Sequence, residues 1–227
     1  MRIIRVEHGG TSYYGILEDG LVFRLHQQPG HMEPIPLSEA KVLPLVTPSK
    51  VVCVGLNYKA HAEELGYPLP NMPSFFLKPP SSIIGNGEPI VLPSGMGRIE
   101  HEAELAMVVG KVCRNLTPEE AEESLFGFTC ANDVTAREVQ KVDPLIGHCK
   151  SYDTFCPIGP WIETELEDIN DLSIRCLVNG EVRQSANTGD MIFRPLDLLC
   201  FLSRVMTLMP GDVILTGTPP GISPIQA

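Results

Sequence analysis

Two glutamates, Glu102 and Glu104, stand two residues apart in RIEHEAELAMVVG, residues 98–110, a stretch typical of a β-strand. Side chains at positions i and i+2 of a strand leave the same face, so the two carboxylates lie side by side. The apolar residues around them indicate a strand that is buried on both faces. Two buried like charges are costly unless a cation or protons neutralise them. The alternative is a polar strand face open to water, the commonest environment of glutamate.

A third carboxylate, Asp133, follows the apolar run LFGFTCAN, residues 125–132, which predicts another buried strand. A carboxylate at the end of a buried strand is well placed to be a third metal ligand. Ligands that are all oxygen favour Mg²⁺, Mn²⁺ or Ca²⁺ over zinc. Taken alone, the Asn-Asp pair at 132–133 is equally typical of a turn or a helix N-cap.

A histidine and a glutamate, His61 and Glu64, lie in LNYKAHAEELG, residues 56–66, which predicts a short helix ending at Gly66. Residues three apart share a helical face, so the two side chains can contact each other. A carboxylate beside a histidine orients the imidazole for base catalysis. The alternative for an isolated pair of this kind is a solvated surface turn.

Two lysines and one loop could meet an anionic substrate. Lys78 lies between apolar residues and two prolines, as either a substrate-facing cation or an edge lysine whose ammonium group reaches water. Lys150 can neutralise a substrate or stabilise an enolate near metal-binding carboxylates, or it can form a simple salt bridge. The segment TGTPPG, residues 216–221, offers backbone N–H groups and hydroxyls that could hold a carboxylate, although by itself it is only a turn.

The elements that carry these residues divide the chain into two predicted parts. Residues 1–25 contain short β-rich pieces, with Asp19-Gly20 as a hairpin turn, and residues 27–48 are rich in proline and polar residues. A clear apolar strand then begins at Lys50. We therefore predict a small N-terminal β subdomain over residues 1–48 and a catalytic domain over residues 49–227.

The larger part predicts mostly strands joined by short helices, an α+β fold dominated by β structure. A capping box with proline at the first helical position starts a helix at Thr117, and Asn179-Gly180 predicts a second hairpin. An amphipathic pattern predicts another helix from about Pro195. The helix at Thr117 is interpreted as a structural element.

Composition restricts the classes of function. The 227 residues are 43% hydrophobic and carry a formal net charge of −11, with lysine and arginine scattered along the chain. This balance argues against binding nucleic acid, and no apolar window is long enough to cross a membrane. The seven cysteines show no zinc spacing, so we expect most to be reduced and buried. These features predict a cytoplasmic protein that acts on a small molecule.

Six motifs, taken in order, resemble one known family. They are GLNYKAHAEELG, the Glu-x-Glu strand, ANDVTARE, KSYDTFCPIGPWI, VNGEVRQ and LTGTPPG. Together they closely resemble the fumarylacetoacetate hydrolase family of metal-dependent enzymes over roughly residues 45–222. The ordered set is far more specific than any one of its motifs.

This resemblance implies a mixed, mostly β fold, a β-roll or β-sandwich-like barrel around the metal, assembled as a homodimer. The metal would be Mg²⁺ or Mn²⁺, with Ca²⁺ also accepted in the family. Matched by position, the residues are Glu102, Glu104 and Asp133 as metal ligands, His61 and Glu64 as the dyad that activates water, Lys150 as the active-site lysine, and Arg137, Gln140 and Thr218 as substrate contacts.

The activity implied first is hydrolysis of a carbon–carbon bond in an acylpyruvate, a 2,4-dioxo acid such as fumarylpyruvate, through a pyruvate enolate. The same enolate chemistry without water gives decarboxylation of an oxaloacetate-like acid or isomerisation of a 2-hydroxy-dienoate. A third alternative is a non-catalytic binding protein that keeps the pocket. The family pattern extends beyond TGTPPG, so the sequence predicts a shortened C-terminus, ending at GISPIQA, and an open sheet edge.

Overall fold

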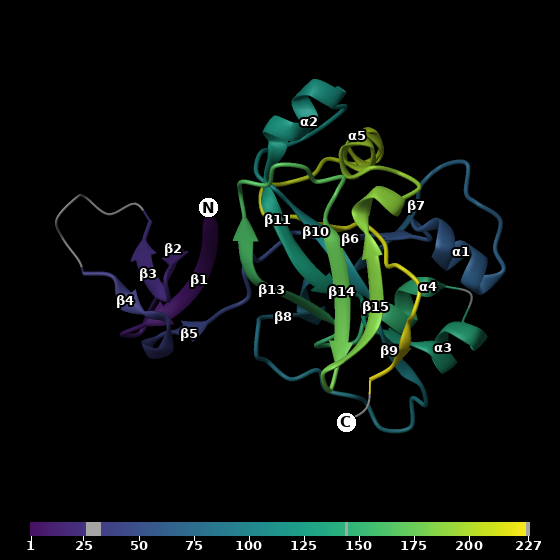
Figure 1. Ribbon diagram of the computed structural model, residues 1–227, viewed down its shortest axis with the longest axis horizontal. Coiled ribbons are helices and arrows are strands. Elements are labelled where there is room, and N and C mark those ends of the chain that lie inside the picture. The colour runs from purple at the N-terminus through teal and green to yellow at the C-terminus, as the bar shows by residue number, and fades with distance from the viewer. Residues whose placement is uncertain (26–32, 144, 226–227) are drawn as a thin grey trace.

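The computed structural model of the chain describes residues 1–25, 33–143 and 145–225 (Figure 1). Strands dominate it, which confirms the mostly β prediction. The N-terminal part holds β1 (Arg2–His8), β2 (Thr11–Glu18), β3 (Leu21–Arg24), β4 (Ile35–Pro36), the 3-10 helix η1 (Leu37–Glu39) and β5 (Lys41–Val42).

The first three strands form an antiparallel meander that stands to one side of the remaining fold (Figure 1). Asp19 and Gly20 both have positive φ, 48° and 77°, as the two central residues of a type I′ turn require, so this hairpin prediction is confirmed. Alternate residues of β1, Ile4 and Val6, are buried against Val22 of β3.

β1 also pairs with β13 of the larger part, so the N-terminal strands continue its sheet. Of the proline-rich stretch 27–48, residues 27–32 lie outside the described part of the chain, and the rest contains β4, η1 and β5. The division into two domains at residue 48 stays a prediction.

The larger part follows from β6 onward. Its strands and helices are β6 (Val51–Gly55), α1 (Lys59–Leu65), β7 (Ser74–Lys78), η2 (Pro80–Ser82), β8 (Ile83–Ile84), β9 (Ile99–His101), β10 (Ala103–Val109), α2 (Pro118–Ser124), β11 (Leu125–Asn132), β12 (Thr135–Ala136), α3 (Arg137–Val142), α4 (Ile146–Lys150), β13 (Cys156–Glu163), β14 (Ser173–Val178), β15 (Glu181–Asn187), η3 (Thr188–Asp190), α5 (Pro195–Val205), β16 (Val213–Leu215) and β17 (Ser223–Pro224).

One large sheet carries the site. Its strands run in the order β4-β3-β2-β1-β13-β11-β10-β16-β6-β7, with β5 paired to β1 and β8 paired to β13. β10 lies near the centre, between β11 and β16, and both pairings are antiparallel. The path of the described strands is open at both ends, so this mixed sheet is not the closed barrel included in the sequence-based prediction.

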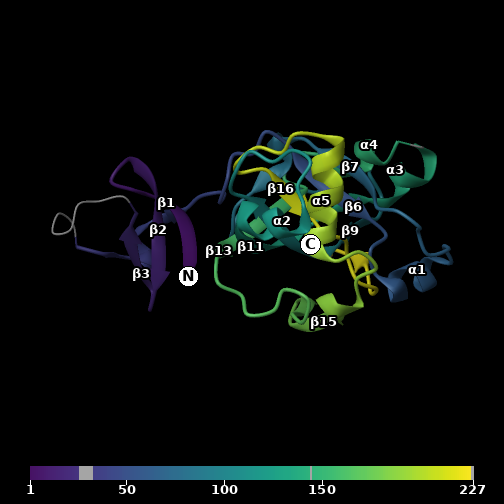
Figure 2. The same cartoon turned by 90° about the horizontal axis from the view of Figure 1, so that it is seen from above.

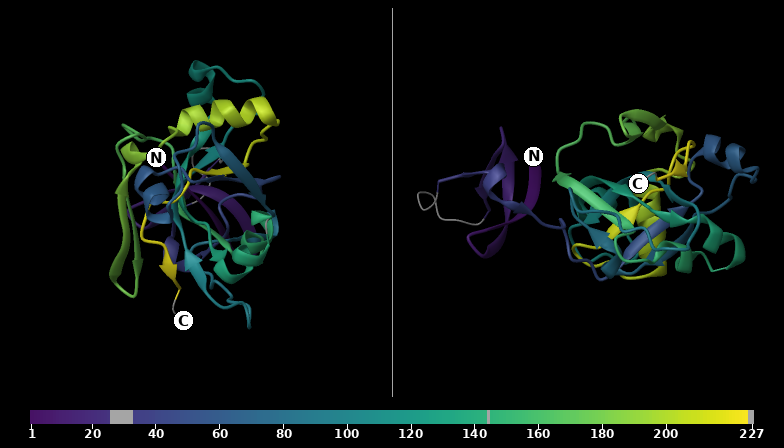
Figure 3. Two further views of the ribbon diagram at one scale, coloured as in Figure 1. Left: turned by 90° about the vertical axis from the view of Figure 1, so that its right-hand side faces the viewer. Right: turned by 90° about the horizontal axis from the view of Figure 1, so that it is seen from below.

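Apolar side chains cover both faces of the central strands. In β6, Val51 and Cys53 face one cluster, while Val52 and Val54 face the other, and all four are buried. The second cluster is closed by α2 and by α5, which crosses above the sheet (Figures 1 and 3). Burying each large aliphatic side chain of this kind contributes about 1.5–3 kcal/mol. This two-sided core holds β10 in a fixed place.

Smaller elements surround the central strands. The β14–β15 hairpin forms a separate layer beside the sheet, and β12, β9 and β17 form a three-stranded sheet (Figure 2). Asn179 and Gly180 have φ of 54° and 83°, and Thr117 and Glu120 form the capping box of α2, so both predictions are confirmed. None of the helices in the described part of the chain is long and apolar enough to cross a membrane.

Candidate metal centre

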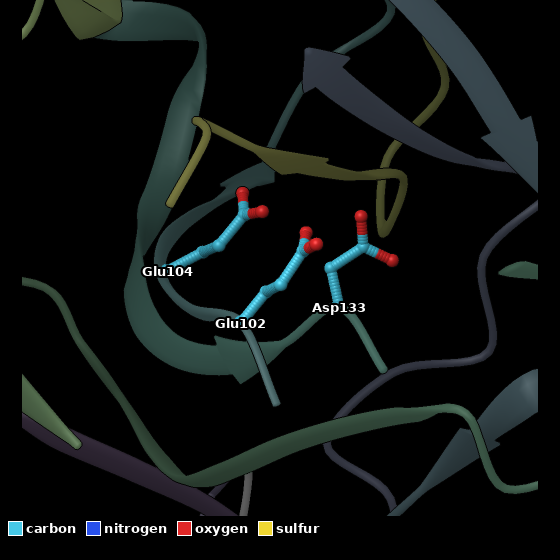
Figure 4. Close-up of side chains that lie close together, drawn as sticks. All are labelled: Glu102, Glu104 and Asp133. Carbon is cyan, nitrogen blue, oxygen red and sulfur yellow. The ribbon is translucent and has the colours of Figure 1, made fainter. Parts of the chain in front are cut away.

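Three carboxylates meet where the central strands end. Glu102, Glu104 and Asp133 each offer an oxygen atom, and these atoms lie within 4.8 Å of one another (Figure 4). Their exposed fractions are 6%, 2% and 1%, so all three groups are removed from water. The spacing of the two glutamates thus brings their side chains together, with Asp133 as the third member.

Backbone geometry at Glu102 explains why the three carboxylates lie close together. The strand predicted over residues 98–110 is interrupted there, between β9 and β10. The Asn132 side chain accepts the Glu102 N–H at 2.9 Å, and the Asp133 N–H donates to the Glu102 carbonyl at 2.9 Å. Asn132 therefore fixes the interruption, while Asp133 supplies the carboxylate.

Two buried lysines neutralise Asp133. Lys78 Nζ lies 2.5 Å from Asp133 Oδ1, and Lys150 Nζ lies 2.6 Å from Oδ2 and 2.7 Å from Glu102 Oε2. Burial alone would lower the pKa of Lys150, but the charges of Asp133 and Glu102 outweigh it and raise that pKa. These two carboxylates therefore favour the charged form of Lys150.

Arg137 at the start of α3 joins the same cluster. Its guanidinium group contacts Glu102 and, through Nε at 2.5 Å, the buried Glu100, and it donates to Gln140 Oε1 at 2.7 Å. Burial would raise the pKa of Glu102, but Lys150 and Arg137 outweigh it and hold that pKa well below its usual range. Glu102 is therefore ionised at neutral pH.

Glu104 is the exception among the three carboxylates. Within the described residues it has no ion-pair partner, and it accepts one hydrogen bond, from Gly217 N at 2.5 Å. Burial, together with the charges of Asp133 and Glu102, raises the pKa of Glu104 well above its usual range. A divalent cation beside it would favour the charged form. Three buried oxygen donors, one of them lacking a cation, fit Mg²⁺, Mn²⁺ or Ca²⁺.

The predicted dyad lies on α1. His61 Nδ1 lies 2.8 Å from Glu64 Oε2, and His61 is buried. A carboxylate oxygen accepts hydrogen bonds, so Nδ1 is the donor in this pair and Nε2 is the ring nitrogen left free. The other Glu64 oxygen accepts the Gly221 N–H at 3.1 Å. The loop after β16 thereby orients Glu64, which in turn orients His61.

A cavity of about 330 Å³ joins these groups. It is lined by residues from α1, α3, α4, the central strands and the loop after β16. Those predicted to act there are His61, Glu102, Glu104, Asp133, Arg137, Gln140, Lys150 and Thr218. Lys78 is not among the lining residues. It is buried behind Asp133 and also contacts the Val134 carbonyl at 3.3 Å, so it acts on the carboxylate and not as an edge lysine.

Thr218 contributes its hydroxyl in a defined direction. Its Oγ1 donates to the Ala103 carbonyl at 2.9 Å and accepts from Gln184 Nε2 at 2.8 Å. The amide nitrogen of Gln184 can only donate and the Ala103 carbonyl oxygen can only accept. The hydroxyl proton of Thr218 therefore points toward the Ala103 carbonyl oxygen. The hydroxyl therefore offers a ligand a lone pair.

Two buried amides at the site were not predicted from the sequence. The side chain of Asn57 donates to the Phe193 and Thr216 carbonyls at 3.0 and 2.7 Å and accepts the Phe193 N–H at 2.8 Å. It anchors the chain just before α1. Gln184 makes four hydrogen bonds from β15. Its signal in the sequence is its place as the last residue of the VNGEVRQ motif, one of the six on which the family resemblance rests.

Comparisons with known proteins place the site in context. A family model described as "Fumarylacetoacetate (FAA) hydrolase C-terminal" matches residues 50–226. A second model, described as "Rv2993c-like, N-terminal", matches residues 1–44. The first match spans every residue of the cavity named above.

Relatives agree with these matches. Protein Rv2993c of Mycobacterium tuberculosis is 45% identical over 193 residues, 84% of this chain and 73% of the relative. Human mitochondrial oxaloacetate tautomerase FAHD2A is 45% identical over 195 residues, which cover 83% of this chain and 62% of the human protein. The crystal structure of 5-carboxymethyl-2-hydroxymuconate delta-isomerase from Mycobacterium smegmatis is similar with a TM-score of 0.90 and 41% identity, covering 99% of this chain and 90% of that chain.

Proposed function

Because the chain belongs to the fumarylacetoacetate hydrolase family, a family of enzymes, we propose that it is a divalent-metal-dependent enzyme acting on a small 2-oxo acid. We further propose that it moves a proton between the 2-oxygen and carbon 3 of that acid, as a tautomerase or isomerase. The similar human protein is named an oxaloacetate tautomerase and the similar mycobacterial structure an isomerase.

The proposed cation is Mg²⁺ or Mn²⁺, with Ca²⁺ as a weaker candidate, held by Glu102, Glu104 and Asp133. Their buried oxygen donors and the raised pKa of Glu104 support this assignment. When bound, such an ion acts as a Lewis acid that stabilises negative charge on a 2-oxo oxygen.

The observation that carries the proposal is the His61–Glu64 contact at 2.8 Å, with His61 lining the same cavity as the three carboxylates. Nε2 of His61, the ring nitrogen that Glu64 does not contact, is assigned as the base. It takes the proton from the enol oxygen or from carbon 3 and delivers it to the other atom, so protons and electrons balance. Glu64 stabilises the transient imidazolium through Nδ1.

Positively charged side chains of the protein also favour negative charge on the bound acid. Lys150 keeps its proton and adds positive charge beside Glu102 and Asp133. Arg137 and Gln140, which line the cavity, are proposed to bind the far end of the acid. Thr218 offers a lone pair, so it is proposed to accept a hydrogen bond from an enol O–H.

Hydrolysis of an acylpyruvate, the first expectation from the sequence, is the second candidate. The same basic Nε2 of His61 could remove a proton from water, whose oxygen would attack the distal carbonyl and release pyruvate with a carboxylic acid. Decarboxylation of oxaloacetate would need the enolate stabilisation but no activated water. The predicted homodimer and cytoplasmic location stay predictions.

A product assay separates these reactions. The purified chain with Mg²⁺ or Mn²⁺ is offered the enol form of oxaloacetate and, separately, fumarylpyruvate, while enol absorbance, pyruvate, organic acid and CO₂ are followed. Metal without protein measures the background. We expect the enol absorbance to change without pyruvate. Pyruvate with a matching acid would establish the hydrolase, and pyruvate with CO₂ the decarboxylase; either result as the main activity contradicts the tautomerase.

A further inference from the structure

Gln184 is a buried amide on β15, a strand whose other residues are exposed or half-buried. Its neighbours on β15, Arg183 and Ser185, are exposed, whereas only 1% of Gln184 is accessible. A buried amide is stable only when its donors and acceptors find partners. Gln184 satisfies all of them, which gives it a defined orientation.

The four partners fix which end of the amide faces which group. The oxygen of Gln184 accepts the Ala103 N–H at 3.0 Å, and its nitrogen donates to the Pro219 carbonyl at 2.8 Å. The oxygen also faces His101 Nδ1 at 2.9 Å, so that nitrogen must carry a proton. A reversed amide would place the Gln184 nitrogen against the Ala103 N–H, donor against donor, and the Gln184 oxygen against the Pro219 carbonyl, acceptor against acceptor.

The hydrogen bond from Ala103 to Gln184 satisfies a backbone group on one side of β10, next to the metal-site glutamates. β16 pairs with β10 only from Ala106 to Val108. Further along this edge, the N–H of Ala103 binds Gln184 and its carbonyl binds Thr218. Ala103 stands between Glu102 and Glu104, so side chains take the place of a neighbouring strand at the residue that separates the two carboxylates.

We propose that Gln184 is a positioning residue for the metal centre. It fixes the backbone at Ala103, between Glu102 and Glu104, and it holds the Thr218 side chain against Ala103. Through Gln184, the β14–β15 hairpin would therefore help to position the metal ligands. This inference rests on the proposed metal binding. It assigns to Gln184 no contact with substrate or metal.

Metal selectivity distinguishes positioning from simple support of the fold. Mg²⁺ demands near-ideal octahedral geometry, whereas Ca²⁺ accepts a flexible coordination sphere. A residue that only stabilises the fold should, when replaced, change the affinity for both ions equally or leave both unchanged. A residue that fixes the separation of two carboxylates should affect Mg²⁺ far more than Ca²⁺.

The test uses the full chain with Gln184→Met, which keeps the volume and removes all four hydrogen bonds. Ser185→Ala, at the exposed neighbouring position, is the matched control. Dissociation constants for Mg²⁺ and Ca²⁺ are measured by calorimetry, and the thermal midpoint of the metal-free protein is recorded. We expect Gln184→Met to weaken Mg²⁺ binding by about 10-fold or more and Ca²⁺ binding by less than about 3-fold.

An equal change for both ions, or none, would overturn the inference while leaving the proposed function intact. If the wild-type chain binds neither ion, the proposed function and this inference fall together. Should Gln184→Met not fold, Thr218→Val removes the parallel bond to Ala103 with little change of shape, and the same shift in selectivity is expected.

A second measurement needs no metal. The ¹⁵N chemical shifts of the His101 ring should show a proton on Nδ1 in the wild-type chain, and that preference should weaken in Gln184→Met. A wild-type ring protonated only on Nε2 would contradict the orientation from which the inference begins.

Discussion

Gly221 and Glu64 join the loop after β16 to helix α1, through a hydrogen bond of 3.1 Å from the Gly221 N–H to Glu64 Oε1. Glu64 uses its other oxygen for His61. The orientation of the proposed base therefore depends on a loop 157 residues away in sequence.

Gly221 cannot be replaced without moving that loop. Its φ is +96°, and a Cβ atom would lie 2.2 Å from the Arg183 carbonyl oxygen. Gly180→Ala is the control, because its φ is +83° but a Cβ there meets nothing within 4 Å. Backbone strain alone should cost the control about 1–2 kcal/mol of unfolding free energy.

We expect Gly221→Ala to lose at least about 1 kcal/mol more than the control, since the clash adds to the strain. It should also reduce turnover, whereas Gly180→Ala should not. Denaturant unfolding and steady-state kinetics measure both effects. Equal stability losses with full turnover in both variants would show that the loop does not hold Glu64.

Replacing His61 should separate proton transfer from metal binding. His61→Ala removes the proposed base but none of the three carboxylates, so turnover should fall by about 10²–10⁴-fold. The dissociation constant for Mg²⁺ should change by less than about 3-fold. Steady-state kinetics and calorimetry on the same preparation give the two values, and full activity in this variant would remove the dyad from the mechanism.

Asp212 links β16 to the start of β6 and should make stability depend on pH. It accepts hydrogen bonds from the backbone and hydroxyl of Ser49, from Met209 N and from Lys50 N, and it pairs with Lys50 Nζ at 2.5 Å. Burial would raise the pKa of Asp212, but these bonds, led by that from Lys50, lower it overall.

A carboxyl with a lowered pKa in the folded state stabilises the fold above its unfolded pKa of about 3.9, and this contribution is lost as pH falls through the folded value. We expect Asp212→Asn to cost about 2 kcal/mol at pH 7 and progressively less below about pH 4. Urea unfolding across pH checks this. The exposed Asp153 provides the control Asp153→Asn, and a pH-independent loss at position 212 would refute the linkage.

The sequence was informative wherever spacing alone determines geometry. Glu102 and Glu104 share a face because strands repeat every two residues, and His61 meets Glu64 because helices bring positions three apart together. The hairpin at Asn179-Gly180 follows from turn chemistry in the same way. The family resemblance then related Asp133 to this set across the chain.

Local sequence patterns could not predict contacts between residues that are far apart in the sequence. Lys78 was expected to face substrate or water, but β7 delivers it to Asp133, 55 residues away. Asn57 and Gln184 gain their roles from backbone groups of distant loops, which no local period predicts. The interruption at Glu102 likewise depends on the Asn132 side chain from a neighbouring strand.

The central claim is that the three carboxylates bind a divalent cation, and Glu104 tests it most directly. Glu104→Gln keeps the shape of the side chain and an oxygen that can accept the Gly217 N–H, so the metal-free fold should survive. Glu123→Gln, at a position with 80% side-chain exposure, is the control.

The measurement is a titration of each protein with Mn²⁺, followed by electron paramagnetic resonance of the free ion. We predict one bound ion per wild-type and Glu123→Gln chain, and an affinity lower by about 100-fold or more in Glu104→Gln. Unchanged Mn²⁺ affinity in folded Glu104→Gln would contradict the proposed metal centre.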